Sequence, residues 1–217
     1  LCVAMRAGHA IHPYFSIKKV RLKVLEHFWY TNLMDEESVP VSKLESPERI
    51  KAEILKMAEE DQKMRRDFMQ GKGLMNPALD AENATKIKRI IKQEGWPIQS
   101  IYGSDVASAA WLLIQHMDED VAFQEECLNA MKSAPEGEVD KTDMAYLEDR
   151  VRVNKGEPQL YGTQGKPDDN KNFVPFPIED PEHLEERRSQ MGMFSHQEYK
   201  EVMEKMYREF RTNSAKK

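Results

Sequence analysis

The sequence predicts a mainly α-helical protein, built as a single-domain, bundle-like array of helices around one buried helix. Apolar residues recur at helical spacing over most of the chain after residue 46. The segment 105–117 is apolar on most of its sides, which is typical of a central helix. At 217 residues the chain is within the range of one hydrophobic core. We therefore expect a helical domain over 46–212, a disordered tail over 213–217, and an N-terminal extension over 1–45 whose folding the sequence leaves open.

Capping residues and glycines mark the expected helix boundaries. Side chains of Ser, Thr, Asp and Asn accept hydrogen bonds from the free N–H groups at a helix start, and glycine takes the left-handed backbone that ends many helices. Proline suits the first helical position because it has no N–H to leave unpaired. These signals predict helices that begin after Ser46, at Asp80, near Val121 after Asp118 and Asp120, near Thr142, at Asp180-Pro181, and at the capping box from Ser195 to Glu198.

The segment 157–177 interrupts the helical pattern. Its prolines, glycines and aromatic residues follow one another too closely for a long helix, so we expect one long irregular connection. A connection of this length inside a compact domain is usually either functional or disordered. The segment is therefore a candidate for ligand or partner binding.

Composition argues against several classes of function. The 38 acidic and 32 basic residues are interspersed, with a net charge of −6, so nucleic-acid binding is not expected. No apolar run approaches the length of a membrane span, so no membrane association is expected. Cys2 and Cys127 form no C-x-x-C pair, and Cys127 in a helix is typical of a small buried side chain, which favours a cytoplasmic protein. The sequence indicates no cofactor and no oligomeric state.

Several segments together resemble a known family. They are Gly95-Trp96-Pro97, AAWLLIQHMDED at 109–120, AYLEDRV at 145–151, GEPQLYGTQ at 156–164 and PIEDP at 177–181. In their order and spacing they resemble an uncharacterised, mostly bacterial family of unknown function with a QH-x-D-x-D and YGTQ signature. The resemblance covers about residues 50–205. It implies no particular reaction, substrate or cofactor.

His116 is the candidate catalytic residue. It follows the apolar helix directly, beside Gln115, where partial withdrawal from water can tune an imidazole for proton transfer. The alternative is a structural histidine that bonds a carbonyl at the helix end, where the helix dipole favours it. Asp120 lies four residues further on, so the two would share a helix face as a metal pair. No third ligand has a recognisable spacing, and we predict no metal site.

Polar side chains crowd the YGTQ segment and are candidates for substrate binding. Gln159, Tyr161, Thr163 and Gln164 surround Gly162, a residue that lets a ligand approach the backbone closely. The alternative is that these side chains satisfy the backbone groups of a buried connection.

Arg65 and Arg150 are the candidate cations. Asp61 precedes Arg65 by one helical turn, and Asp149 precedes Arg150 directly, so ion pairs account for both. Either guanidinium would alternatively hold a carboxylate or phosphate of a ligand. We include Arg150 among the substrate-binding candidates. Arg187 and Arg188 are expected on an ordinary charged solvent face.

Two functions remain open. The sequence lacks the G-x-S-x-G elbow, the phosphate-binding G-x-x-x-x-G-K-[ST] loop and H-E-x-x-H. The first hypothesis is a small hydrolytic or group-transfer enzyme for a small polar molecule, with His116 as general acid or base and Gln115 among its binding residues. The alternative is a non-catalytic helical module that recognises a protein or small ligand through the 157–177 loop. Exposed Tyr161, Phe173 and Phe176 would anchor that partner.

Overall fold

The structure, a computed structural model, describes residues 46–170 and 172–214, with side chains placed as far as residue 208. It confirms a mainly α-helical domain. The helices are α2 (Pro47–Met69), α3 (Pro77–Glu94), α4 (Gln99–Tyr102), α5 (Ser104–Ile114), α6 (Val121–Ser133), α7 (Lys141–Asn154), the 3₁₀ helix η2 (Pro181–His183), α8 (Leu184–Gln190) and α9 (His196–Ser214), and the strands are β1 (Gly165–Pro167) and β2 (Phe173–Pro175).

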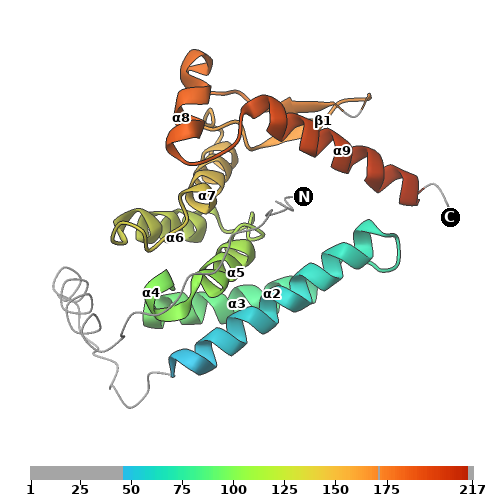
Figure 1. Cartoon of the computed structure of the whole chain (residues 1–217). Helices are drawn as coiled ribbons and strands as arrows, with labels where there is room; N and C mark the ends of the chain where they lie inside the picture. The colour runs from blue at the N-terminus through green and yellow to red at the C-terminus, as the bar shows by residue number, and fades with distance from the viewer. Residues whose placement is uncertain (1–45, 171, 215–217) are drawn as a thin grey trace. The chain divides into compact units, whose positions relative to one another are not determined.

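Helix α5 is the central helix that the sequence predicts. It packs against α2, α3, α4 and α7, and Figure 1 shows α2, α3 and α5 side by side. Ala110 and Ile114 of α5 are fully buried, as are Ile54 of α2 and Ile87 of α3. These residues recur at helical spacing, so each helix buries one apolar stripe against its neighbours. The end of α5 carries Gln115 and His116, two of the candidate site residues.

Helices α5 and α7 contact each other along their length. Near their N-terminal ends the Ser108 hydroxyl donates a hydrogen bond of 3.1 Å to the Asp143 carboxylate. Beyond the end of α5, Arg150 Nη1 lies 2.8 Å from Asp118 Oδ2. Contacts at both ends fix the register between the two helices. We call the interface between these contacts the α5–α7 seam.

The segment 157–177 contains a short antiparallel hairpin. Lys166 of β1 lies opposite Val174 of β2, and Gln159 forms an isolated parallel bridge to Ile178. Phe173 is only 2% exposed, because its ring packs edge-on against Tyr199 of α9 at 5.5 Å. The expectation of an exposed Phe173 is therefore wrong. The hairpin is attached to α9 by an aromatic contact.

Most capping predictions are confirmed. The Ser46 hydroxyl accepts a hydrogen bond from Arg49 N, and the Asp120 carboxylate accepts one from Phe123 N. In the last capping box Ser195 donates to the Glu198 carboxylate and accepts from the Glu198 amide. Each side chain satisfies an amide that the first helical turn leaves unpaired.

Two boundary predictions are wrong. Helix α3 begins at Pro77 rather than Asp80, because the Asn76 side chain accepts hydrogen bonds from two amides of its first turn. Asp180 does not cap the helix after it. Its φ is 45°, in the left-handed region, and its carboxylate lies 2.8 Å from His183 Nδ1 instead.

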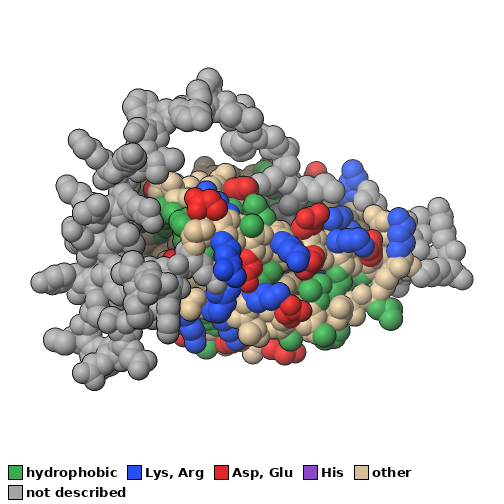
Figure 2. Space-filling view, turned by 90° about the horizontal axis from the view of Figure 1, so that it is seen from below, with side chains coloured by type: hydrophobic (Ala, Val, Ile, Leu, Met, Phe, Trp, Pro, Cys, Tyr) green, Lys and Arg blue, Asp and Glu red, His purple; other side chains and the backbone are tan. Residues whose placement is uncertain are grey.

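The extension over 1–45 lies outside the described residues, as do residues 215–217 of the tail, while α9 extends to Ser214. Figure 2 shows acidic and basic side chains interspersed on one face of the described surface. Within the described part of the chain, no helix combines the length and the apolar character needed to cross a membrane.

Candidate functional site

The candidate site begins with His116 and a carboxylate on another helix. Asp61, on α2, is 1% exposed, and its Oδ2 lies 3.2 Å from His116 Nδ1 in the turn after α5. The atoms are at ion-pair distance, although the alignment is poor for a hydrogen bond. The imidazole is 11% exposed, so it borders solvent from a largely buried position. We call these residues the Asp61–His116 pair.

Arg65 holds the carboxylate of this pair in place. Its Nε donates to Asp61 Oδ1 at 2.9 Å, which confirms the ion pair expected from their spacing. Its Nη2 donates to Asp80 of α3, also at 2.9 Å. The guanidinium thus links α2 to α3 beside the imidazole.

The two members of the pair are charged differently near neutral pH. Burial opposes ionisation of Asp61, but the contacts with His116 and Arg65 outweigh it and lower the pKa of the carboxyl to about 2. Burial lowers the pKa of His116 below its ordinary value, although Asp61 raises it. At neutral pH a carboxylate therefore faces a neutral imidazole. Because the carboxylate only accepts, its position favours the tautomer that carries the proton on Nδ1 and leaves Nε2 as the basic nitrogen.

We expect Asp61 to stabilise the fold in a pH-dependent way. Its pKa is lower in the folded chain than the ordinary 3.8, so its contribution is present above about pH 4 and is lost as the pH falls toward 2. The shift corresponds to about 2 kcal/mol. Urea unfolding of the wild type and Asp61→Asn between pH 6 and pH 3 should show the difference between them shrinking as the pH falls. Asp169→Asn, at an exposed carboxyl of the segment 157–177, is the control. A difference that stays constant would contradict the lowered pKa.

Arg150 has a different partner from the one that the sequence suggests. The sequence pairs it with Asp149, but its Nη1 donates to both oxygens of Asp118, at 2.8 and 2.9 Å. Asn154 also donates to Asp118, which therefore anchors α7 instead of capping α6. The positive charge of Arg150 helps to keep the pKa of His116 low.

Gln115 joins this group. It is the C-cap residue of α5, is 1% exposed, and lies next to His116 in the chain. No hydrogen-bond partner for its Nε2 is found in the part of the chain that the structure describes. A buried donor without an acceptor is costly, and ligand binding by Gln115 stays a prediction.

Asp149 anchors the YGTQ segment. This fully buried carboxylate accepts hydrogen bonds from the amides of Leu160, Tyr161 and Thr163 at 2.7, 3.0 and 2.9 Å. The Thr163 hydroxyl donates a further one at 2.8 Å. Burial raises the pKa of Asp149, and these donors oppose the rise. A single side chain of α7 therefore accepts hydrogen bonds from three backbone amides and one hydroxyl of this segment.

The glutamines of the segment bond to the segment itself. Gln159 Nε2 donates to the carbonyl oxygens of Gln164 and Phe176, and its Oε1 accepts from the Gln164 amide. Gln164 Nε2 donates to the Thr163 hydroxyl at 3.1 Å. These are the contacts of the structural alternative, in which side chains satisfy buried backbone. Ligand binding by Gln159, Thr163 and Gln164 stays a prediction.

Gly162 makes the tight turn of this segment. Its φ is 70°, and a Cβ there would lie 2.8 Å from His196 Nε2. A larger residue would meet both a strained backbone and a packed ring. The glycine is thus explained by close packing against α9.

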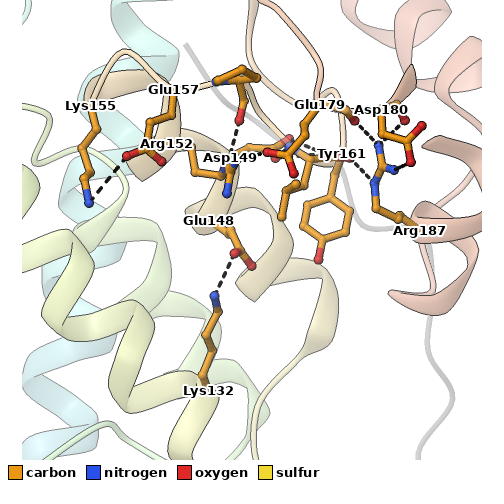
Figure 3. A network of polar contacts seen from close by, with 12 residues as sticks. Lys132, Glu148, Asp149, Arg152, Lys155, Glu157, Tyr161, Glu179, Asp180 and Arg187 are labelled. Atoms are coloured by element: carbon orange, nitrogen blue, oxygen red, sulfur yellow. Dashed lines mark hydrogen bonds and ion pairs between the residues drawn. The ribbon is translucent and has the colours of Figure 1, made fainter. Parts of the chain in front are cut away.

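Tyr161 lies apart from His116. Burial raises the pKa of its half-buried hydroxyl, and the charges of Glu148, Arg152 and Arg187 also act on this pKa. Figure 3 shows these residues in one network. Glu148 and Arg152 lie on nearly the opposite side of α7 from Arg150. Gln115 adjoins His116 in the chain and the charge of Arg150 acts on the pKa of His116, whereas Tyr161 belongs to a network on nearly the opposite side of α7.

Arg188 is not the solvent-exposed residue that the sequence suggests. It is fully buried, donates to the carbonyl oxygens of Phe194 and Tyr161, and lies 5.4 Å from the Tyr199 ring centre. The signal that sequence reasoning missed is its position one turn after Leu184, a buried apolar residue. Its neighbour Arg187 donates to three carbonyl oxygens, which Figure 3 shows in part.

His116 and Asp120 do not share a helix face, and the expected cap at Asp120 is confirmed. Asp120 caps α6 and pairs with Lys88 of α3, because α5 ends before His116 and the chain turns between the two residues. In residues 46–170 and 172–214, no three His, Cys, Asp or Glu side chains gather closely enough to hold a metal ion.

A family model matches residues 48–210, a range that includes Asp61, His116 and Arg150. The chain belongs to the Family of unknown function (DUF6624). All the segments that carry the resemblance in the sequence lie within this DUF6624 match. Neither a curated protein nor a solved structure matches the chain significantly. The function of this DUF6624 chain must therefore be argued from its own residues.

Proposed function

We propose that this DUF6624 chain is a small hydrolytic enzyme in which His116 is the general base and Asp61 positions it. The Asp61–His116 pair carries the proposal. A buried, ionised carboxylate fixes the tautomer of a neutral imidazole, which is the arrangement that a proton acceptor near pH 7 requires. Arg65 keeps the carboxylate ionised.

The proposed step uses water and a carbonyl substrate. His116 Nε2 takes a proton from the water as the water oxygen bonds to the carbonyl carbon. The imidazolium then returns this proton to the leaving nitrogen or oxygen as its bond to carbon breaks. Asp61 stabilises the transient imidazolium without itself taking the proton, because its pKa is about 2. The imidazole is neutral again at the end of the cycle.

Gln115 is the proposed binding residue beside His116, and Arg150 supports the site through its ion pair with Asp118. The loop residues act indirectly in this proposal, because they hold Asp149, which is adjacent to Arg150 on α7. We further infer that the QHMDED and YGTQ segments mark the site across the family. Burial raises the pKa of the free thiol of Cys127 to about 12, which makes it unreactive and fits a cytoplasmic location.

The alternative of a non-catalytic module loses one of its anchors, because Phe173 is buried. Both hypotheses are tested by one screen. Purified wild type and His116→Asn are compared on a panel of small amides and esters, with release of acid or amine as the readout. His183→Asn is the matched control, because His183 also pairs with an aspartate but is exposed. We expect activity that His116→Asn loses and His183→Asn keeps. Equal activity in His116→Asn and wild type would remove the general base from the proposal.

A further inference from the structure

Two buried donors on the α5–α7 seam lack acceptors. Trp111 Nε1 and Gln115 Nε2 belong to residues that are 6% and 1% exposed, and neither atom has a hydrogen-bond partner among the described residues. The residues are one turn apart on α5, so they share a face. An indole N–H can only donate, so the missing partner of Trp111 must be an acceptor. Leaving such a donor unpaired costs about 1–3 kcal/mol.

The register of the seam places Gln115 between two contacts with α7. The Trp111 ring meets the Tyr146 ring edge-on at 6.0 Å. One turn further along α7, Arg150 pairs with Asp118. In the chain, Gln115 follows Trp111 by one helical turn and comes before Asp118, next to His116. Trp96 has an equally buried and unpaired indole but is elsewhere, at the end of α3. Trp111 differs from Trp96 because a second unpaired donor, Gln115 Nε2, follows it by one turn of the same helix.

The charges around the site decide which acceptor fits. Arg65 pairs with Asp61 and Asp80, and Arg150 pairs with Asp118, so three carboxylates surround two guanidiniums. The imidazole adds no charge near neutral pH. A ligand carboxylate would therefore enter a group that is already negative and would lose its hydration without gaining a counter-charge. A neutral carbonyl oxygen accepts the same hydrogen bonds without this penalty.

We propose that the α5–α7 seam binds the carbonyl oxygen of an uncharged amide or ester, with the Trp111 indole N–H and the Gln115 amide N–H as its donors. The inference deepens the proposed function and rests on it for the hydrolytic step. As water adds to the carbonyl, negative charge develops on this oxygen, and the two donors stabilise it. Arg65 and Arg150 then hold the carboxylates of the protein instead of an anionic group of the substrate.

Binding is measured on the full-length chain without relying on catalysis. Acetamide and acetate are titrated separately while the indole N–H signals are followed by nitrogen-15 NMR, with Trp111→Phe and Trp96→Phe to assign them. We expect acetamide to shift the Trp111 signal and leave the Trp96 signal in place, and acetate to bind at least tenfold more weakly. Gln115→Leu, which keeps the volume and removes the donor, should weaken acetamide binding about fivefold to tenfold. Gln115→Glu should weaken it as well and guards against a packing defect in the leucine variant.

The outcomes separate the two proposals. An unmoved Trp111 signal, or acetate binding as tightly as acetamide, would overturn the carbonyl site. Acetamide binding that His116→Asn retains, with no amide or ester hydrolysed by the wild type, would uphold the carbonyl site and refute the proposed function. Binding together with hydrolysis that depends on His116 would support both.

Discussion

Replacing Asp149 by alanine is expected to lower the free energy of unfolding by about 3–5 kcal/mol. The carboxylate is fully buried and accepts hydrogen bonds from three amides and the Thr163 hydroxyl. Alanine leaves all four donors without an acceptor at a position where Asp149 and Thr163 are buried. Urea unfolding followed by far-ultraviolet circular dichroism at pH 7 measures the difference.

A graded series shows whether the hydrogen bonds are the cause. Thr163→Val removes only the hydroxyl donor and should cost about 1 kcal/mol. Asp149→Asn keeps the size of the side chain and one acceptor oxygen, so it should lie between Thr163→Val and Asp149→Ala. Asp169→Ala, at an exposed carboxyl of the same segment, should leave stability unchanged. If Asp149→Ala cost no more than Thr163→Val, other contacts would be holding the turn.

Asp149 and Arg150 show how the structural and the candidate functional parts of the chain are joined. Adjacent residues of a helix point about 100° apart, so Asp149 faces the YGTQ turn while Arg150 faces the seam. The turn thereby helps to fix α7, the helix that carries Arg150. This explains why a segment rich in hydrogen-bonding groups can matter for function without touching a ligand.

Local signals explain the part of the structure that the sequence predicted. The caps at Ser46, Asp120 and Ser195 and the ion pair between Asp61 and Arg65 each join residues within one helical turn. Such contacts follow from backbone geometry, whatever the tertiary fold. The burial of α5 was likewise evident, because a helix apolar on most sides has to be enclosed.

The contacts that define the site are tertiary, and sequence patterns did not reveal them. Asp61 lies on α2 and His116 beyond α5, and no spacing rule relates them. Asp149 and Arg150 both had acidic or basic neighbours that accounted for them, so their true partners were missed. The loop glutamines were ambiguous for a different reason. Buried backbone and a ligand demand the same chemical groups, and only the contacts distinguish the two uses.

The second large effect is expected on catalysis, in variants of the Asp61–His116 pair. With a substrate from the screen, His116→Asn should lower kcat about 10²–10⁴-fold, because water then loses its proton acceptor. Asp61→Asn should lower kcat substantially as well, because an amide no longer fixes the Nδ1–H tautomer or stabilises the imidazolium. The double variant should be no slower than His116→Asn, since residues that act as one unit have non-additive effects. Initial rates across pH 5–9 provide the comparison.

Stability measurements on the same variants separate this role from a structural one. If His116 served only to fill its position, His116→Ala would lower the free energy of unfolding by about 3 kcal/mol or more, and any loss of rate would follow the loss of folded protein. If His116 is a general base, the rate falls although the folded fraction is kept. The folded fraction of His116→Asn stays near that of the wild type at pH 7, because Arg65 still holds the ionised Asp61 and asparagine retains a polar side chain at position 116. Rates that multiply independently in the double variant would mean that the two residues do not act as a pair.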